Sequence, residues 1–187
     1  IEICIENKVK FLTFFALSSE NIQRISVNII YDLILNNLEI FLDNISNNNK
    51  VKIQIFGNRD DLPRKIKKII EKIEIVTKGN SQLYLNVALN YGSKNEIVQC
   101  FNNLLNNNAK DEVINEQIIR DNLYLPDVPD PDILIRTGGF QRLSNFLLFQ
   151  ISYTELFFTK TLWPEITEKE IINIFNKYKN IERKYGL

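Results

Sequence analysis

The stretch of sequence that decides the fold runs from Asp132 to Glu165 and reads DILIRTGGFQRLSNFLLFQISYTELFFTKTLWPE. It begins as an apolar run of strand character and then breaks into Arg136-Thr137-Gly138-Gly139, with Arg142 and Ser144 following. Guanidinium groups bind phosphate oxygens bidentately, and glycines let backbone N–H groups approach an anion. This pattern predicts a strand that ends in a diphosphate-binding turn.

A single acid, Glu155, lies in the apolar and aromatic second half of the stretch before Trp163. A carboxylate in such surroundings is costly unless it has a function or a partner. Glu155 is therefore a candidate functional acid, with a structural ion-pair partner as the alternative. For Arg136 and Arg142 the alternative is a pair of surface salt bridges, but the neighbouring glycines and Ser144 favour an anion site.

Composition is ordinary for a globular protein. The chain has 187 residues, of which 44% are hydrophobic and 25% charged, with a formal net charge of zero. The protein has no overall positive charge that would attract nucleic acid, so any anion must be bound by locally placed Arg and Lys. Cys4 and Cys100 lack metal-ligand spacing and are expected to be buried free thiols in a reducing cytoplasmic compartment. No apolar run is long enough to span a bilayer.

Apolar periodicity predicts strands that alternate with helices. Strands are expected at residues 9–17, 51–56, 83–89, around 133 and at 155–158. Helices are expected at residues 1–6, 27–45, 62–78, 96–105, 115–122, 146–153 and 168–185, with a loop in the Asn-rich segment before 115. The run at residues 9–17 is almost continuously apolar and predicts a strand buried on both faces.

This alternation predicts an α/β fold with a mostly parallel central sheet flanked by helices on both faces. Ligands of such sheets bind beyond the carboxyl ends of the strands. Polar clusters fall at those ends, at residues 18–24, 57–58, 90–92 and 136–144. We therefore expect them to meet at one edge and form one site. The length fits a single domain, residues 1–187.

Three ordered motifs resemble the cis-prenyltransferase family, and most closely its bacterial undecaprenyl diphosphate synthases. They are FLTFFALSSENIQR, LYLNVALNYGSKNEIV with the preceding GNRDDLPRKI, and IRTGGFQRLSNFLLFQISYTELFFTKTLWPE. The resemblance covers essentially the whole chain and implies one cis-prenyltransferase domain with a hydrophobic tunnel. The helix at residues 27–45 would line that tunnel, with ordinary core as the alternative.

The resemblance implies a transferase that condenses isopentenyl diphosphate units onto farnesyl diphosphate to make a cis-polyprenyl diphosphate. The product would be undecaprenyl diphosphate, the carrier lipid of bacterial cell-wall peptidoglycan, and the cofactor would be Mg²⁺. A homodimer is implied, with FLLFQISYTELFF at residues 146–158 as its apolar interface. The basic cluster Arg64, Lys65, Lys67 and Lys68 is either a solvated helix face or a peripheral membrane contact for product release.

In the C-terminal motif, the resemblance assigns Arg136, Arg142 and Ser144 to the isopentenyl diphosphate headgroup. Glu155 matches the acid that helps to organise Mg²⁺ and diphosphate. Ionisation of an allylic diphosphate releases pyrophosphate, so arginines and Mg²⁺ would stabilise the developing negative charge.

In the N-terminal motif, Ser18, Glu20, Asn21 and Arg24 match residues that contribute to catalysis and substrate positioning. Ser18 to Asn21 are also helix-capping types. Ala16 matches a small residue beside the tunnel that houses the growing chain, where an apolar wall would keep water from the allylic cation.

Several positions depart from the family pattern. The first strand, with its phosphate-binding turn and catalytic Asp, has no match and would precede Ile1, so we expect the sequence to be incomplete at its N-terminus. Ile22 stands where the family usually has Trp, and the chain is shorter than expected after Arg24. Phe140 stands where an acidic residue is common, and Asn58 replaces a common Asp.

Two rival functions remain. Some relatives keep the fold but lose catalytic residues and serve as accessory subunits of a prenyltransferase complex. The unmatched Asp fits that reading, whereas the presence of Glu20, Asn21, Arg136, Arg142 and Ser144 argues against it. A generic nucleotide-binding module has little support, because no glycine-rich loop follows a strand with Rossmann or Walker spacing.

Overall fold

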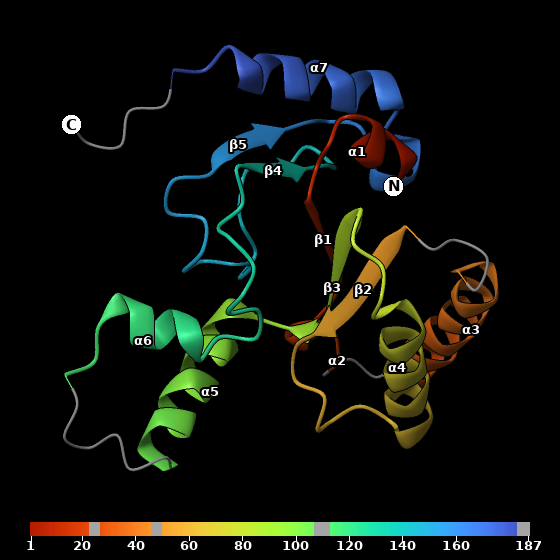
Figure 1. Ribbon diagram of the computed structural model, residues 1–187, viewed down its shortest axis with the longest axis vertical. Coiled ribbons are helices and arrows are strands. Elements are labelled where there is room, and N and C mark those ends of the chain that lie inside the picture. The colour runs from red at the N-terminus through yellow and green to blue at the C-terminus, as the bar shows by residue number, and fades with distance from the viewer. Residues whose placement is uncertain (23–26, 46–49, 107–112, 183–187) are drawn as a thin grey trace. The chain divides into compact units, whose positions relative to one another are not determined.

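The computed structural model describes residues 1–22, 27–45, 50–106 and 113–182 (Figure 1). They form two compact units, Ile1–Val128 and Pro129–Leu187. The first unit has a three-stranded sheet and the second a two-stranded sheet. Every strand pairing within them is parallel. The α/β class with parallel sheets flanked by helices is thus confirmed, although the single sheet that we expected is divided into two.

The sheet of the first unit has the order β1-β3-β2. Its strands are β1 (Phe11–Ser18), β2 (Val51–Phe56) and β3 (Leu83–Tyr91). The helices of this unit are α1 (Glu2–Glu6), α2 (Ser19–Ile22), α3 (Val27–Ile45), α4 (Arg64–Thr77), α5 (Ser93–Asn106) and α6 (Glu116–Asp121). Helix α3 has the predicted bounds, while β3 runs two residues beyond the prediction and reaches the polar cluster at its end.

The prediction that residues 9–17 form a strand buried on both faces is wrong. β1 lies at an edge of its sheet, and Leu17 is its one buried residue. The central strand is β3, in which Leu83, Leu85 and Ala88 are each at most 2% exposed. A continuous apolar run indicates a strand that avoids water, but it does not identify which strand has a neighbour on both sides.

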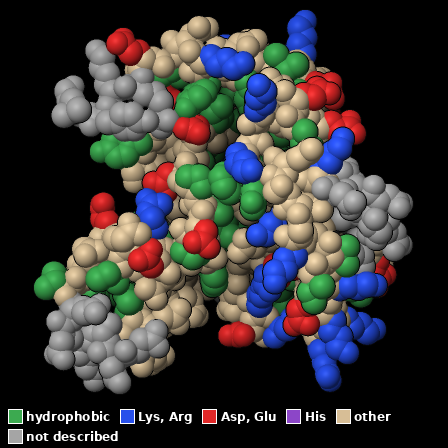
Figure 2. Space-filling view, viewed as in Figure 1, with side chains coloured by type: hydrophobic (Ala, Val, Ile, Leu, Met, Phe, Trp, Pro, Cys, Tyr) green, Lys and Arg blue, Asp and Glu red, His purple; other side chains and the backbone are tan. Residues whose placement is uncertain are grey.

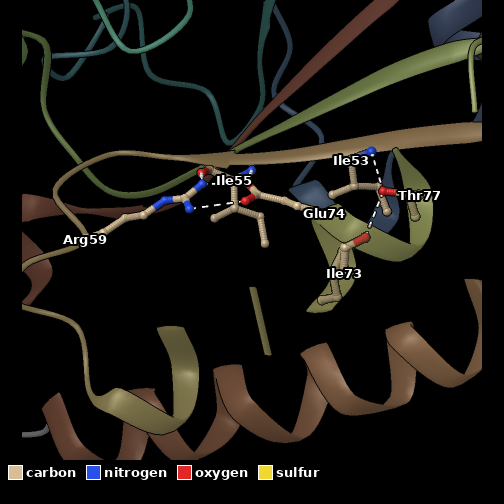
Figure 3. Close-up of polar contacts among 6 residues, drawn as sticks. All are labelled: Ile53, Ile55, Arg59, Ile73, Glu74 and Thr77. Atoms are coloured by element: carbon tan, nitrogen blue, oxygen red, sulfur yellow. Dashed lines mark hydrogen bonds and ion pairs between the residues drawn. The ribbon is translucent and has the colours of Figure 1, made fainter. Parts of the chain in front are cut away.

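Helix α4 closes the outer edge of β2, as the close-up in Figure 3 shows. Thr77 Oγ1 accepts a hydrogen bond of 3.1 Å from the backbone N of Ile53. Glu74 Oε1 accepts one of 2.9 Å from the backbone N of Ile55 and forms an ion pair with Arg59. At an unpaired strand edge inside a protein, backbone N–H and C=O groups lack hydrogen-bond partners, and this lowers stability. Side chains of α4 satisfy two of them on β2.

The two long helices of the first unit differ in burial. Helix α4 buries Ile66, Ile69, Ile70 and Ile73, the apolar face that its sequence predicted. Figure 2 shows Lys and Arg side chains gathered on the side where α4 lies. In α3, by contrast, none of the side chains at residues 29–40 is buried. The side chains at residues 29–40 are therefore half-buried or exposed, so this part of α3 is less well packed than α4.

The second unit consists of a small sheet and one long helix. β4 (Ile133–Arg136) pairs with β5 (Glu155–Phe158). A short 3₁₀ turn, η2 (Trp163–Glu165), leads to α7 (Glu168–Lys179). Thr167 and Glu170 form a reciprocal capping box that fixes the start of α7. The helix ends at Lys179, earlier than predicted, and residues 183–187 lie outside the described chain.

The prediction of a helix at residues 146–153 is wrong. This segment is a succession of turns, with bonds such as Gln150 N to Leu147 O at 3.0 Å. Ser144, Asn145 and Leu147 have positive φ angles of 50°, 63° and 46°. Non-glycine residues rarely adopt this conformation, and it interrupts a right-handed helix. Such strain gathers at functional sites.

The described helices include none that is both long and apolar enough to cross a membrane. Cys4 and Cys100 are buried free thiols, as predicted. Burial raises the pKa of both thiols, which keeps them protonated and unreactive.

Gly57, in the turn after β2, supports a direct test of the packing at the carboxyl edge of the sheet. Its φ is 130°, and an added Cβ would lie 2.1 Å from the carbonyl oxygen of Leu89. We expect Gly57→Ala to lower the free energy of unfolding by about 2–4 kcal/mol.

The matched control is Gly79→Ala, because no heavy atom lies within 4 Å of a Cβ built on Gly79. This change should stay within about 0.5 kcal/mol of the parent protein. Urea denaturation measures both differences. Equal urea midpoints for the two variants would contradict the close approach of β2 and β3 at Gly57.

Candidate functional site

The polar turns of the first unit meet at the carboxyl edge of its sheet, as the sequence predicted. The backbone N of Asn58 donates to the carbonyl oxygen of Asn90 at 3.0 Å. The Asn90 amide donates to the carbonyl oxygen of Asn58 at 2.8 Å. Ser18 is paired in register with Tyr91. Three of the four predicted clusters therefore begin at one edge, and the fourth lies in the second unit.

Ser18 caps the short helix that follows β1. Its Oγ accepts a hydrogen bond of 3.2 Å from the backbone N of Asn21. The neighbouring Ser19 hydroxyl donates to Glu20 Oε2 at 3.3 Å. The hydrogen bond confirms that Ser18 caps this helix, and α2, which carries Glu20 and Asn21, begins directly after β1. Arg24, predicted to act beside them, lies outside the described residues.

Ala16 is the extra residue of a β-bulge. Phe15 pairs with Ala88 and Leu17 with Leu89, so Ala16 has no partner of its own on β3. Its small side chain is exposed although the strand around it is apolar. Bulges are frequent beside active sites, where they turn a side chain out of the regular alternation.

A cavity of about 370 Å³ opens at the carboxyl end of β2. It is lined by Gln54, Ile55, Phe56, Gly57, Asn58, Arg59, Asp60, Gln99 and Tyr124. Burial, followed by the charge of Glu96, raises the pKa of Tyr124 to about 12, so its hydroxyl stays protonated. Arg59 is the only cation in this lining and is bound to Glu74. The cavity therefore offers a diphosphate no unpaired cation.

The glycine turn after β4 is held by the segment that follows β5. The backbone N of Gly138 donates to the carbonyl oxygen of Thr161, and that of Gly139 to Thr159, both at 2.9 Å. Their φ angles of 84° and 77° explain the need for glycine. Our expectation that these N–H groups face an anion is wrong, because both already donate within the protein. The turn positions Arg136 and Arg142 instead.

Arg136 and Ser144, two of the three residues assigned to the diphosphate site, are joined by a hydrogen bond. Arg136 Nη1 donates to Ser144 Oγ at 2.9 Å. Its Nε is buried and has no hydrogen-bond partner among the described residues. Burial, and then the nearby charge of Arg142, lower the pKa of Arg136. Two guanidinium groups thus lie close enough to repel each other.

Neither guanidinium is neutralised within the described chain. No ion pair of Arg136 or Arg142 with a carboxylate occurs among the described residues, in contrast to Arg59, which pairs with Glu74. This observation counts against the surface salt-bridge interpretation. The Phe140 ring lies 4.2 Å from the Arg142 guanidinium carbon and 6.0 Å from that of Arg136. The sequence did not predict this contact.

Glu155 opens β5, and its backbone N donates to the carbonyl oxygen of Asp132 at 3.0 Å. Its side chain is half-buried and makes no hydrogen bond or ion pair with any described residue. The ion-pair interpretation of Glu155 therefore has no partner in this part of the chain. Its carboxylate is available to a cation.

Mg²⁺ is the cofactor that the family resemblance implies, and the residues present can be tested against it. No group of three or more potential metal-ligating side chains occurs among the described residues. Mg²⁺ is usually held by one or two carboxylates together with substrate phosphates and water, rather than by a cage of side chains. Glu155, an unpaired carboxylate in the same unit as two unpaired arginines, fits that mode of binding.

The decisive comparison is with protein families. A family model described as putative undecaprenyl diphosphate synthase matches residues 1–186. The chain belongs to the undecaprenyl diphosphate synthase family. It is accordingly a prenyltransferase, and the nucleotide-binding alternative is excluded.

Curated relatives agree with membership of this family. An isoprenyl transferase of Fusobacterium nucleatum is 40% identical over 192 residues, which cover 100% of this chain and 80% of that protein. A tritrans,polycis-undecaprenyl-diphosphate synthase (geranylgeranyl-diphosphate specific) of Pyrobaculum aerophilum is 39% identical over 184 residues. That match covers 95% of this chain and 77% of the relative.

Solved structures share the fold of the family. A probable undecaprenyl diphosphate synthase from Campylobacter jejuni superposes with a TM-score of 0.89 at 34% identity, covering 99% of this chain and 88% of that one. Lavandulyl diphosphate synthase from Lavandula x intermedia, in complex with dimethylallyl diphosphate, has a TM-score of 0.89 at 25% identity. It is matched over 100% of this chain and 83% of its own.

A hydrogen-bond network of Thr159, Thr161 and Glu170 supports the turn at Gly138 and Gly139. The sequence did not predict this network. Thr161 Oγ1 donates to Glu170 Oε1 at 2.6 Å, and Thr159 Oγ1 lies 3.4 Å from the same oxygen. The carbonyl groups of these two threonines bind the N–H groups of Gly138 and Gly139. Glu170 thereby connects α7 to the turn that carries the arginines.

The hydrogen bond from Thr161, followed by the bond from the Thr167 backbone, lowers the pKa of Glu170 in the folded protein. A lowered folded-state pKa stabilises the protein above the unfolded pKa of glutamate, about 4.3, and that contribution disappears as the pH falls through the folded value. We expect Glu170→Gln to lower the urea midpoint at pH 7, with the difference from the parent protein shrinking below about pH 4.

The matched control for this titration is Glu168→Gln, in the same helical turn. The urea midpoint should be measured at several pH values for all three proteins. A Glu170→Gln difference that does not change with pH, or an equal change in the control, would contradict the network.

Proposed function

We propose that this prenyltransferase condenses isopentenyl diphosphate units onto farnesyl diphosphate to form undecaprenyl diphosphate, the carrier lipid of bacterial cell-wall synthesis. The observation that carries this proposal is the pair Arg136 and Arg142, two adjacent guanidinium groups without a carboxylate partner in the described chain. Family membership supports the class of substrate. The name of the Pyrobaculum relative makes geranylgeranyl diphosphate the rival primer.

In this proposal the second unit binds the diphosphate of isopentenyl diphosphate. Arg136 and Arg142 donate charge-assisted hydrogen bonds to its oxygens, and Ser144 both orients Arg136 and offers a hydroxyl. The mutual repulsion of the two cations is relieved when an anion lies between them. The repulsion between the two guanidinium groups, which is unfavourable without a ligand, therefore favours binding of the diphosphate.

Glu155 would hold Mg²⁺ together with substrate phosphates. When bound, Mg²⁺ neutralises negative charge that develops on the diphosphate leaving group. Glu155 suits this function because its carboxylate is half-buried and unpaired among the described residues.

The first unit would hold the allylic primer and the growing chain. Ser18, Glu20, Asn21 and Arg24 would position the primer and contribute to catalysis. Ala16 would border the tunnel. The exposed apolar residues of α3, such as Ile29, Leu33 and Ile40 at 64%, 57% and 60% exposure, support a lipid-lining function for that helix. Closing such a surface around an isoprenoid would also exclude water.

We further propose a cytoplasmic homodimer with a peripheral membrane contact. Alternate residues of β5 support the dimer, since Leu156 and Phe158 are 42% and 39% exposed and a second copy would cover them. Light scattering measures this oligomeric state directly, and a monomer at micromolar concentration would contradict it.

Buried, protonated thiols suit a reducing compartment. The basic face of α4 would contact anionic lipid, as flotation with charged vesicles tests.

The activity assay combines the protein with radiolabelled isopentenyl diphosphate, Mg²⁺ and either farnesyl or geranylgeranyl diphosphate. We expect a butanol-extractable product of undecaprenyl length, formed faster from farnesyl diphosphate. Chelation of Mg²⁺ should abolish the reaction and its return should restore it. No product with either primer would contradict the proposal, and a clear preference for geranylgeranyl diphosphate would overturn the assigned primer.

Single variants test the assigned residues. Arg142→Ala should raise the KM for isopentenyl diphosphate by about tenfold or more, because a hydrogen bond to a charged group is lost. Glu155→Gln should raise the Mg²⁺ concentration needed for half-maximal rate. The control is Lys68→Ala, which removes an exposed cation from α4 and should change neither quantity. Equal effects of Arg142→Ala and Lys68→Ala would exclude a specific arginine site.

A further inference from the structure

The conformation of Arg142 requires an explanation, because the surroundings of this side chain oppose it. Arg142 is exposed, so its long side chain is able to turn into water. Arg136 lies near the same Phe140 ring, so the two like charges are close together and repel each other. No carboxylate in the described chain draws it back. Something other than ion pairing must keep the two guanidinium groups together.

The contact that does so is aromatic. The guanidinium carbon of Arg142 lies 4.2 Å from the centre of the Phe140 ring, well within the range of a cation–π interaction. Arg136 lies at 6.0 Å from the same centre, at the outer limit of that range. No hydrogen bond of Arg142 occurs among the described residues to add to this contact.

The ring itself is fixed by the turn that precedes it. Gly138 and Gly139 donate to the carbonyl oxygens of Thr161 and Thr159 at 2.9 Å, so the backbone just before Phe140 is bound to the segment that follows β5. Phe140 remains 52% exposed, which leaves a ring face accessible to a cation. Hydrogen bonds thus hold the backbone that leads to Phe140, while the ring itself is not buried.

We propose that Phe140 is a positioning residue that holds Arg142 beside Arg136 through its ring, and so pre-organises the pair for the diphosphate of isopentenyl diphosphate. This inference rests on the proposed function of the arginine pair. An aromatic ring attracts a guanidinium group without occupying its N–H donors and without cancelling its charge. Both remain available for bidentate bonds to phosphate oxygens.

Arg59 shows the contrasting arrangement within the same protein. Arg59 Nη1 donates to Glu74 Oε2 at 3.2 Å, and its Nη2 contacts both Glu74 and the carbonyl oxygen of Ile55. Its donors and charge are consumed in holding β2 and α4 together, as Figure 3 shows. An arginine held by a carboxylate is structural, whereas one held by a ring remains free to bind an anion.

The test compares two substitutions at one position, assayed in the complete protein. Phe140→Leu keeps an apolar side chain but removes the ring, and it should raise the KM for isopentenyl diphosphate about two- to fivefold, with kcat changed less than about twofold. Phe140→Tyr keeps the ring and should retain the parent KM.

Phe101→Leu is the control, since it removes another exposed ring, on α5 of the first unit, and should change neither constant. Binding of inorganic pyrophosphate, measured by calorimetry without primer, should weaken in Phe140→Leu by the same factor as KM rises. A purely structural effect would lower kcat in the Leu and Tyr variants alike, and that result would overturn the proposal.

The Arg142→Ala variant separates the two possible failures. If Arg142→Ala raises KM while Phe140→Leu leaves both KM and pyrophosphate binding unchanged, the arginine site stands and the role of Phe140 is overturned. If Arg142→Ala itself leaves KM unchanged, the assigned isopentenyl diphosphate site fails, and this inference fails with it.

Discussion

The function that we propose depends on one electrostatic constraint, the close approach of two guanidinium groups without a carboxylate among the described residues to neutralise them. Arg136 is fixed by Ser144 at 2.9 Å, and Arg142 contacts the Phe140 ring at 4.2 Å. Like charges in proximity are unfavourable unless an anion joins them. The backbone around them is tied down through Gly138 and Gly139. The second unit therefore maintains an unfavourable pair of charges that a diphosphate would relieve.

The first unit combines polar turns at the edge of its sheet with exposed apolar side chains on a helix. Parallel pairing of β1, β3 and β2 brings the carboxyl ends of all three strands to one edge. The outer edge of β2 is closed by Glu74 and Thr77 of α4, so that side of the sheet is structural. Helix α3 exposes apolar side chains such as Ile29, Leu33 and Ile40. A polar sheet edge and an unburied apolar helix in one unit suit a substrate with a diphosphate head and an isoprenoid tail.

Sequence alone identified the class of fold, the elements with clear periodicity and the arginine motif, because these depend on local patterns. It failed where neighbours decide the outcome. The apolar run of β1 did not reveal an edge strand, and the apolar run at residues 146–153 did not reveal the left-handed conformations that replace a helix. Glycines in the motif suggested N–H groups directed at an anion, whereas Thr159 and Thr161 accept those hydrogen bonds. The Phe140 contact and the Glu170 network depend on side-chain geometry that spacing does not specify.

The most direct test of the arginine pair is NMR of the arginine Nε–H groups in ¹⁵N-labelled protein titrated with isopentenyl diphosphate. Arg136 Nε is buried and has no partner among the described residues, so its signal should respond strongly, together with that of Arg142. Arg59, bound to Glu74, is the internal reference and should not shift. Saturable shifts confined to Arg136 and Arg142 are the predicted result. Unchanged signals for those two residues at saturating ligand, or a larger shift for Arg59, would contradict the account.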